Sequence, residues 1–264
     1  MGDSPGTELA LAALWLLFIG THVGLATASV RGALVSRLTE RGYLIVFTVV
    51  ASVTFSLLVA FFATHPVSGV PALGLGAHPV ARPILLGISG CGVSLMTAAF
   101  APTGYWDSPA VLMATGVRPA MGLERVTRHP FFAGTVLLMG SHLLLATDMA
   151  SVIFLGGFVV LAILGPVHQA KKLRAKHGRA YDEYLASTSA IPFLAILQGR
   201  QQLALGEQPW ALLILGALSA AGIRYVHSNL FIWWGAPVWG AAVAGSVLIA
   251  LVTFSRTARS NPEG

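Results

Sequence analysis

The sequence predicts an all-α fold, a polytopic integral membrane helical bundle with six to seven transmembrane helices. Hydrophobic residues make up 55% of the 264 residues and charged residues only 10%, with a mean hydropathy of +0.76. A soluble domain of this length does not bury so much apolar surface. The apolar residues gather in stretches of about 20, the length that an α-helix needs to cross a bilayer. Basic residues occupy the loops between alternate stretches, as the positive-inside rule requires.

The first four predicted spans are bounded by recognisable signals. The first follows an acidic start at Asp3 and Glu8, and the second follows the basic residue Arg41. The third is rich in glycine, a pattern that favours close helix packing and could also line a slot for a substrate. The fourth begins at Pro130, which suits the first turn of a helix. These spans cover residues 9–30, 43–63, 84–101 and 130–147.

Three further stretches complete the predicted bundle. The fifth ends shortly before a basic segment, and the sixth begins beside Trp210, a residue type enriched at membrane interfaces. The seventh is the reason why the count is left at six or seven. They cover residues 150–167, 209–226 and 236–254, and the whole chain, 1–264, is treated as one transmembrane domain.

The distribution of basic residues predicts the topology. We expect a bacterial inner-membrane protein with its N-terminus outside. In this orientation 14 of the 16 Lys and Arg residues fall in inner segments, and only Arg82 and Arg224 fall outside. Topology therefore accounts for the net charge of +6, and we expect membrane lipids rather than nucleic acid as partners. The basic segment 171–179, with Tyr181 and Tyr184 after it, is predicted to be a solvated helix on anionic lipid.

Two histidines lie inside long apolar stretches, His22 in the first and His142 in the fourth. An ionisable residue within a membrane span is a functional hypothesis by default. His22 lies eight residues before position 30 and His142 twelve after Pro130, so the helical rise places them about 12 and 18 Å from the inner boundary. Because the two depths are similar, we expect both histidines to bind one metal centre. The alternative is that each imidazole hydrogen-bonds to a neighbouring helix.

A third histidine belongs to a cationic motif, Arg128-His129-Pro130, at the predicted inner interface. Arg128 and His129 are suited to bind an anionic group such as a lipid phosphate. His129 lies thirteen residues before His142, about 20 Å along a helix, which is too far for both to hold one metal ion. The remaining histidines are expected to be solvated or to cap helices: His65, His78, His168, His177 and His227. The single cysteine, Cys91, excludes an intrachain disulfide and any cysteine-rich metal site.

Three segments together resemble one family. They are FIGTHVGLA, VTRHPFFAGTVLLMGSHLLLATD and TSAIPFLAILQGRQ, within about residues 10–205, and they are similar to the NnrU family, whose plant relatives are the 15-cis-zeta-carotene isomerases. The resemblance implies that His22 and His142 bind the iron of haem b and act as catalytic residues in the cis–trans isomerisation of a lipophilic polyene. It also makes a haem propionate a second candidate for the anionic group at Arg128 and His129. It leaves any redox partner unknown. The isomerase branch has a cysteine three residues before the second histidine, where this chain has Met139.

Two alternative functions stay open. Bacterial NnrU proteins are associated with nitric oxide and denitrification metabolism, which suggests a membrane accessory protein. The segments RHPFFAG and LRAKHGRAYDEYLASTSAIPF also resemble membrane methyltransferases of the isoprenylcysteine carboxyl type, which use S-adenosylmethionine. Those enzymes carry acidic residues just before the second segment, whereas this chain has Gln169 and Ala170.

Overall fold

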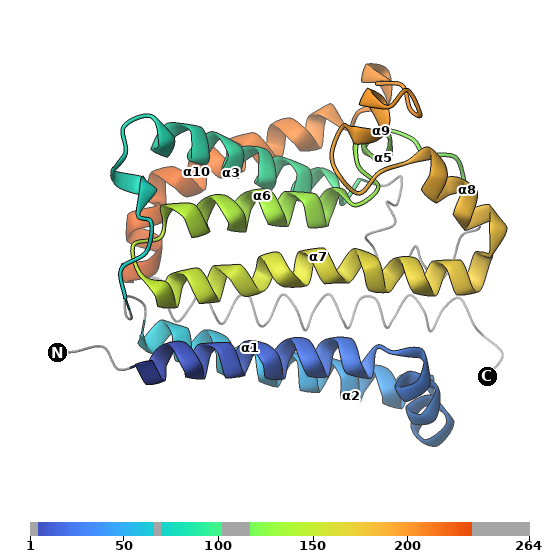
Figure 1. Cartoon of the computed structure of the whole chain (residues 1–264), viewed down its shortest axis with the longest axis horizontal. Coiled ribbons are helices and arrows are strands. Elements are labelled where there is room, and N and C mark those ends of the chain that lie inside the picture. The colour runs from blue at the N-terminus through green and yellow to red at the C-terminus, as the bar shows by residue number, and fades with distance from the viewer. Residues whose placement is uncertain (1–4, 66–69, 102–116, 234–264) are drawn as a thin grey trace. The chain divides into compact units, whose positions relative to one another are not determined.

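The structure is a computed structural model that describes residues 5–65, 70–101 and 117–233 (Figure 1). Every regular element within these ranges is helical, which confirms the predicted all-α class. The helices long and apolar enough to cross a membrane are α1 (Pro5–Leu25), α2 (Ala28–Thr64), α3 (Ala81–Ala98), α7 (Met149–His177) and α10 (Trp210–Trp233). The predicted fourth span forms the shorter apolar helix α6 (Pro130–Leu145). The predicted seventh span lies outside the described residues.

Short helices connect these spans. They are η1 (Leu75–Ala77), α5 (Leu123–Val126), α8 (Arg179–Ser187), α9 (Leu194–Leu197) and η2 (Leu205–Glu207). The chain divides into two compact units. The first comprises Met1–Ala72, Asp148–Phe154 and Val226–Gly264, and the second comprises Leu73–Thr147 and Leu155–Tyr225.

Three predicted helix boundaries were wrong. The first span ends at Leu25 rather than at residue 30, because Thr27 has an extended backbone and a new helix begins at Ala28. That helix, α2, runs through the basic segment predicted as a loop and is interrupted only at Thr39, where φ is 65°. An ion pair between Arg31 and Glu40 spans this interruption. The fifth span, α7, continues past residue 167 to His177 as one helix that carries the basic residues.

The first unit is packed through apolar and aromatic side chains. Leu11, Trp15 and Phe18 of α1 are buried, as are Leu58 and Val59 of α2. The ring of Phe154 in the first turns of α7 stacks on that of Phe62, with centroids 4.0 Å apart. These contacts give this unit a core made of large side chains.

In the second unit, helices α3, α6 and α10 meet at glycines. A Cβ atom built on Gly92 of α3 would lie 2.7 Å from the carbonyl oxygen of Gly134 in α6, and one on Gly134 would lie 2.6 Å from the carbonyl oxygen of Gly92. On α10, a Cβ atom at Gly216 would lie 2.6 Å from Cα of Ser94. Small residues that bring helix backbones together are typical of membrane proteins. The expected packing role of the glycine-rich third span is therefore confirmed at Gly92.

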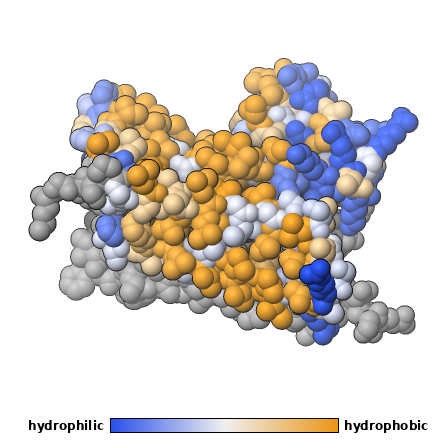
Figure 2. Space-filling view, turned by 60° about the horizontal axis from the view of Figure 1, so that its bottom comes forward, coloured by the Kyte–Doolittle hydropathy of each residue, from blue (hydrophilic) through white to orange (hydrophobic). Residues whose placement is uncertain are grey.

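Large apolar side chains also remain on the outside of the helices. Ile214, Leu215 and Leu218 of α10 are all exposed. Figure 2 shows hydrophobic residues covering much of the face in view. Such a surface is stable in lipid rather than in water, in agreement with the membrane class that the sequence predicts.

Candidate functional site

His142 lies in the last turn of α6 and contacts α3. Its Nδ1 atom is 2.9 Å from the carbonyl oxygen of Leu138, one turn earlier, and 3.3 Å from the buried hydroxyl of Ser89. A carbonyl oxygen can only accept a hydrogen bond, so Nδ1 carries the proton and donates it. The neutral ring then has its lone pair on Nε2. This is the arrangement by which proteins orient a histidine that ligates a metal.

His22 lies in the last turn of α1, in an aromatic environment. The centroid of its ring is 5.3 Å from that of Phe18 and 5.0 Å from that of Phe47. Tyr43 donates a hydrogen bond from its hydroxyl to the carbonyl oxygen of Leu25, over 3.2 Å, and so fixes the end of the helix that carries His22. The imidazole is half-buried in the first unit, whereas His142 belongs to the second.

The corrected end of α1 changes the depth of His22. It lies three residues before the end of its helix at Leu25, about 4.5 Å along the axis, whereas His142 lies twelve residues from the start of α6, about 18 Å. The expectation of similar depths therefore loses its basis. The pairing of the two histidines then depends on the family resemblance alone.

The surroundings of both histidines fit a flat cofactor. No described atom lies within 4 Å of the position that a Cβ atom would occupy on Gly20, Gly24 or Gly140. These glycines flank His22 and His142, so a planar macrocycle can approach the backbone of each helix there. No group of three or more His, Cys, Asp and Glu side chains suited to a metal ion is present in the described ranges. The fit consists of one oriented imidazole and uncovered small residues beside each histidine.

The segments that carry the family motifs meet at the start of α6. The Thr127 hydroxyl donates to the carbonyl oxygen of Ala190 (2.9 Å). The backbone N–H of Arg128 donates to the carbonyl oxygen of Ser189 (2.8 Å). The backbone N–H of Phe193 donates to the carbonyl oxygen of Val126 (2.8 Å). The RHP motif and the TSAIPF motif, more than 50 residues apart in sequence, thus form one hydrogen-bonded cluster.

Arg128 is the cation at the centre of this cluster. Its Nη1 atom lies 3.4 Å from the carbonyl oxygen of Leu185 and 3.5 Å from the hydroxyl of Thr188, and burial lowers the pKa of its guanidinium. Within the described ranges no carboxylate forms an ion pair with Arg128. Buried charges are normally paired, so this guanidinium is suited to an anionic ligand. The neighbouring Arg200 is held by the end of α8, through the carbonyl oxygens of Ala186 (2.6 Å) and Thr188 (2.8 Å).

The structure separates the cationic motif from the second histidine. Arg128 and His129 precede α6, and His142 lies near its other end, about 20 Å away along the helix axis. His129 is buried and its ring contacts that of Phe132, with centroids 6.0 Å apart. The predicted site residues of the second unit therefore lie in two places, one at each end of α6.

The sequence interpretation of the basic segment was wrong for the two tyrosines. Tyr181 and Tyr184 of α8 are buried, and their rings stack with centroids 5.7 Å apart. They pack with Leu173 of α7 and Ala120. The two tyrosines are three residues apart, so they share one face of α8 and bury it. Burial, with the carboxylate of Glu124 as a second cause, raises the pKa of Tyr184 well above its usual value.

Two ion pairs near the start of α6 were missed by the sequence analysis. Arg118 binds the fully buried carboxylate of Glu124 through two contacts, of 2.6 and 3.2 Å. Arg125 binds Glu207 in the same way, over 2.8 and 3.0 Å, and its hydrogen bond lowers the pKa of that carboxyl. Glu124 and Glu207 were the signal that could have predicted these pairs, because each lies in or near a segment that we described only by its basic residues.

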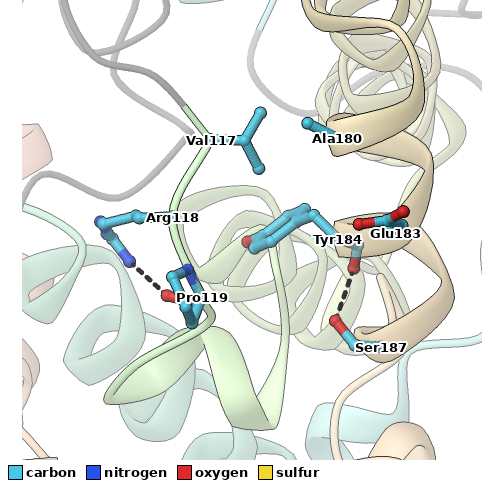
Figure 3. A pocket seen from close by; sticks show the side chains of 7 residues that line it. All are labelled: Val117, Arg118, Pro119, Ala180, Glu183, Tyr184 and Ser187. Carbon is cyan, nitrogen blue, oxygen red and sulfur yellow. Dashed lines mark hydrogen bonds between the residues drawn. The ribbon is translucent and has the colours of Figure 1, made fainter.

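A shallow pocket of about 290 Å³ opens beside α8 (Figure 3). It is lined by Val117, Arg118, Pro119, Ala180, Glu183, Tyr184 and Ser187. Arg118 is already bound to Glu124, and Ser187 donates its hydroxyl hydrogen to the carbonyl oxygen of Tyr184 (3.0 Å). Arg118, Ser187 and Glu183, which pairs with Arg179 (3.1 Å), thus already have partners within the fold.

Comparison with known proteins gives the family. A family model described as "NnrU protein" matches residues 10–254, which extends the similarity beyond residue 205, where the motifs end. Two curated relatives are the chloroplastic 15-cis-zeta-carotene isomerases of Zea mays and Arabidopsis thaliana. Each is 24% identical over 208 residues, which cover 76% of this chain and 54% and 53% of the relatives. The chain thus spans about half the length of the curated relatives it matches. No solved structure matches.

Proposed function

The chain belongs to the NnrU family, and we propose that this membrane protein binds haem b and isomerises a cis double bond in a polyene such as zeta-carotene. The observation that carries the proposal is the similarity to two proteins named as isomerases of such a polyene. The orientation of His142 supports the haem part, because a carbonyl oxygen holds Nδ1 and Nε2 is then the nitrogen that would bind iron. We also place the protein in a bacterial inner membrane with its N-terminus outside, on the basis of the distribution of basic residues.

The proposed iron ligands are His22 and His142. When bound, the haem would supply a redox-active iron that lowers the π-bond order of the polyene and so permits rotation. His142 is held in one orientation by Leu138 and Ser89, while Phe18 and Phe47 surround His22 with apolar rings. The hydrogen bonds orient His142, and the two rings cover part of His22.

Met139 distinguishes this chain from the isomerase branch. It lies three residues before His142, on the same side of α6, at the position where that branch has a cysteine. A thioether is a weaker and uncharged ligand compared with a thiolate, so we propose that isomerisation here does not use a cysteine ligand.

We propose that Arg128 and His129 hold an anionic group. Their distance of about 20 Å from His142 along α6 favours a lipid phosphate over a propionate of a haem bound at His142. The guanidinium of Arg128 supplies the charge, and its lowered pKa reflects the burial that an anion would offset.

The test is co-expression with enzymes that make a cis-configured zeta-carotene, in darkness, because light isomerises such polyenes without an enzyme. We expect the product to shift toward isomers with fewer cis bonds, and expect His22→Ala and His142→Ala to abolish the shift. His65→Ala is the matched control, since His65 ends α2 and bonds locally to the carbonyl oxygen of Phe61 (3.0 Å).

Two other results would contradict the proposal. Unchanged isomer ratios with a haem-loaded protein would favour the accessory role in nitric oxide metabolism. A methylated product that depends on Arg128 and His129 would favour the methyltransferase.

A further inference from the structure

The segment between α8 and α10 exposes an unusual amount of apolar surface. Ile191 is 63% exposed, Leu197 of α9 is 81% exposed and Leu205 of η2 is 58% exposed. Phe193, Leu203 and Trp210 are also exposed. We call residues 191–210 the apolar loop. Exposed apolar surface on this scale in so short a segment indicates contact with something other than water.

Hydrogen bonds hold the apolar loop in place, so its exposed side chains are fixed outward. The backbone of Phe193 is bonded to Val126, and the guanidinium of Arg200 is bonded to the end of α8. The Gln208 amide donates to the carbonyl oxygen of Gly122 (3.2 Å), and the Trp210 indole donates to that of Leu205 (2.9 Å). These side chains therefore cannot be buried by a simple collapse of the loop.

The backbone of Phe193 supports this conclusion. Its φ of 64° lies in the left-handed region, which is disfavoured for residues other than glycine. In this conformation Phe193 stays 50% exposed at the surface. Such strain persists where the surroundings compensate for it, and here the hydrogen bond between the Phe193 N–H and the Val126 carbonyl oxygen (2.8 Å) fixes this conformation.

The position of the apolar loop identifies its surroundings. Through Val126 and Gly122 it is bonded to the residues that precede α6, and it leads directly into α10 (Figure 1). It therefore lies at the level where two apolar helices begin. Its exposed residues are continuous in sequence with those of α10, a candidate membrane span.

Basic residues at the same end of the unit are also suited to contact with anionic lipid. The last turns of α7 carry four basic residues, Lys171, Lys172, Arg174 and Lys176. Cationic residues beside an apolar surface are typical of elements that lie in the interface of an anionic membrane.

We propose that the apolar loop is a membrane-interface element that inserts its exposed apolar side chains among the lipids of the leaflet where α6 and α10 begin. The loop lies in the headgroup region and does not cross the bilayer. It anchors the cluster of Arg128 and Arg200 at the membrane surface, where anionic lipid headgroups are available. This inference is independent of the haem and isomerase proposals.

The test uses the full-length protein in liposomes that contain anionic phospholipid. In a Cys91→Ser background, Leu197→Cys and, separately, Ile191→Cys are labelled with an environment-sensitive fluorophore. Arg179→Cys is the matched control, because its side chain is 93% exposed in α8, at the same end of the unit. We expect blue-shifted emission at residues 197 and 191, iodide quenching severalfold weaker than at 179, and quenching by lipids spin-labelled near the headgroup.

Two outcomes would overturn the proposal. If iodide quenches the label at 197 as strongly as the label at 179, the loop faces water. If the label is protected from iodide and unaffected by spin-labelled lipid, a protein surface covers the loop, either a second copy of this chain or another protein. Circular dichroism of each variant checks that the helices are retained.

Discussion

The hydroxyl of Ser89 on α3 lies 3.3 Å from Nδ1 of His142 on α6. The two helices come together at Gly92 and Gly134, where their backbones are almost in contact, so this approach brings the hydroxyl to the imidazole. Ser89 thereby contacts the same nitrogen of His142 that the Leu138 carbonyl oxygen holds. The relationship links helix packing in the second unit to the orientation of the proposed ligand.

Ser89→Ala is expected to weaken haem binding by roughly tenfold. This is the smaller of the losses in affinity that follow when a side chain bonded to a metal ligand is removed. The effect is limited because the Leu138 carbonyl still accepts from Nδ1. Haem transfer to apomyoglobin measures the change, together with the reduction potential. Ser94→Ala is the control, since the Ser94 hydroxyl bonds within its own helix, to the carbonyl oxygen of Gly90. Equal haem loss from both variants would mean that Ser89 acts only through packing.

His22→Ala and His142→Ala are each expected to change the visible spectrum of the purified protein. Two imidazole ligands give a low-spin haem b, and the loss of one should give a high-spin spectrum or loss of haem. His78→Ala should leave the spectrum intact, because Nδ1 of His78 accepts hydrogen bonds from the N–H groups of Val80 and Ala81 at the start of α3. A colourless wild-type protein from haem-replete cells would refute the haem proposal.

Gly134→Ala is expected to destabilise the second unit by about 1–3 kcal/mol, the usual cost of adding a methyl group to a packed core. The new Cβ atom would meet the carbonyl oxygen of Gly92 at 2.6 Å, and a backbone atom cannot move aside as a flexible side chain can. Gly222→Ala on α10 is the control, because no described atom lies within 4 Å of its Cβ position. Unfolding in mixed detergent micelles gives both stabilities, and similar values would contradict the tight α3–α6 contact.

Glu207→Gln is expected to lower stability at neutral pH by a small amount that disappears in acid. The hydrogen bond from Arg125 lowers the pKa of Glu207, so the carboxylate contributes stability above its unfolded pKa and loses it as the pH falls through the lowered folded value. The pair is exposed to solvent, so the effect should also decrease with added salt. Denaturation of wild type and variant between neutral and acidic pH provides the measurement. A difference that grows in acid would have the wrong sign.

Local sequence determined the fold class and most of the spans. Apolar stretches of about 20 residues identify helices wherever they occur, because hydropathy depends on composition and not on neighbours. Five of the predicted spans within the described ranges correspond to α1, α2, α3, α7 and α10, and α6 begins at the predicted Pro130. Sequence also identified the family, since its motifs are short ordered strings of residues.

Helix boundaries in the basic segments were less predictable. Hydropathy continues through Ala26 and Thr27, so the break between α1 and α2 was not visible, although it moves His22 to the last turn of its helix. Likewise, the charge of residues 31–41 predicted a loop, where the structure has helix on both sides of Thr39.

The contacts that build the candidate site were decided by tertiary structure alone. Ser89 and His142 are 53 residues apart, Arg125 and Glu207 are 82 apart, and Phe193 reaches Val126 across the cluster that follows α5. Sequence shows that such residues are polar, glycine-rich or aromatic, but not which helix faces which. That choice is made when backbones pack at Gly92, Gly134 and Gly216, because the fit of two surfaces is a property of both helices together and of neither sequence by itself.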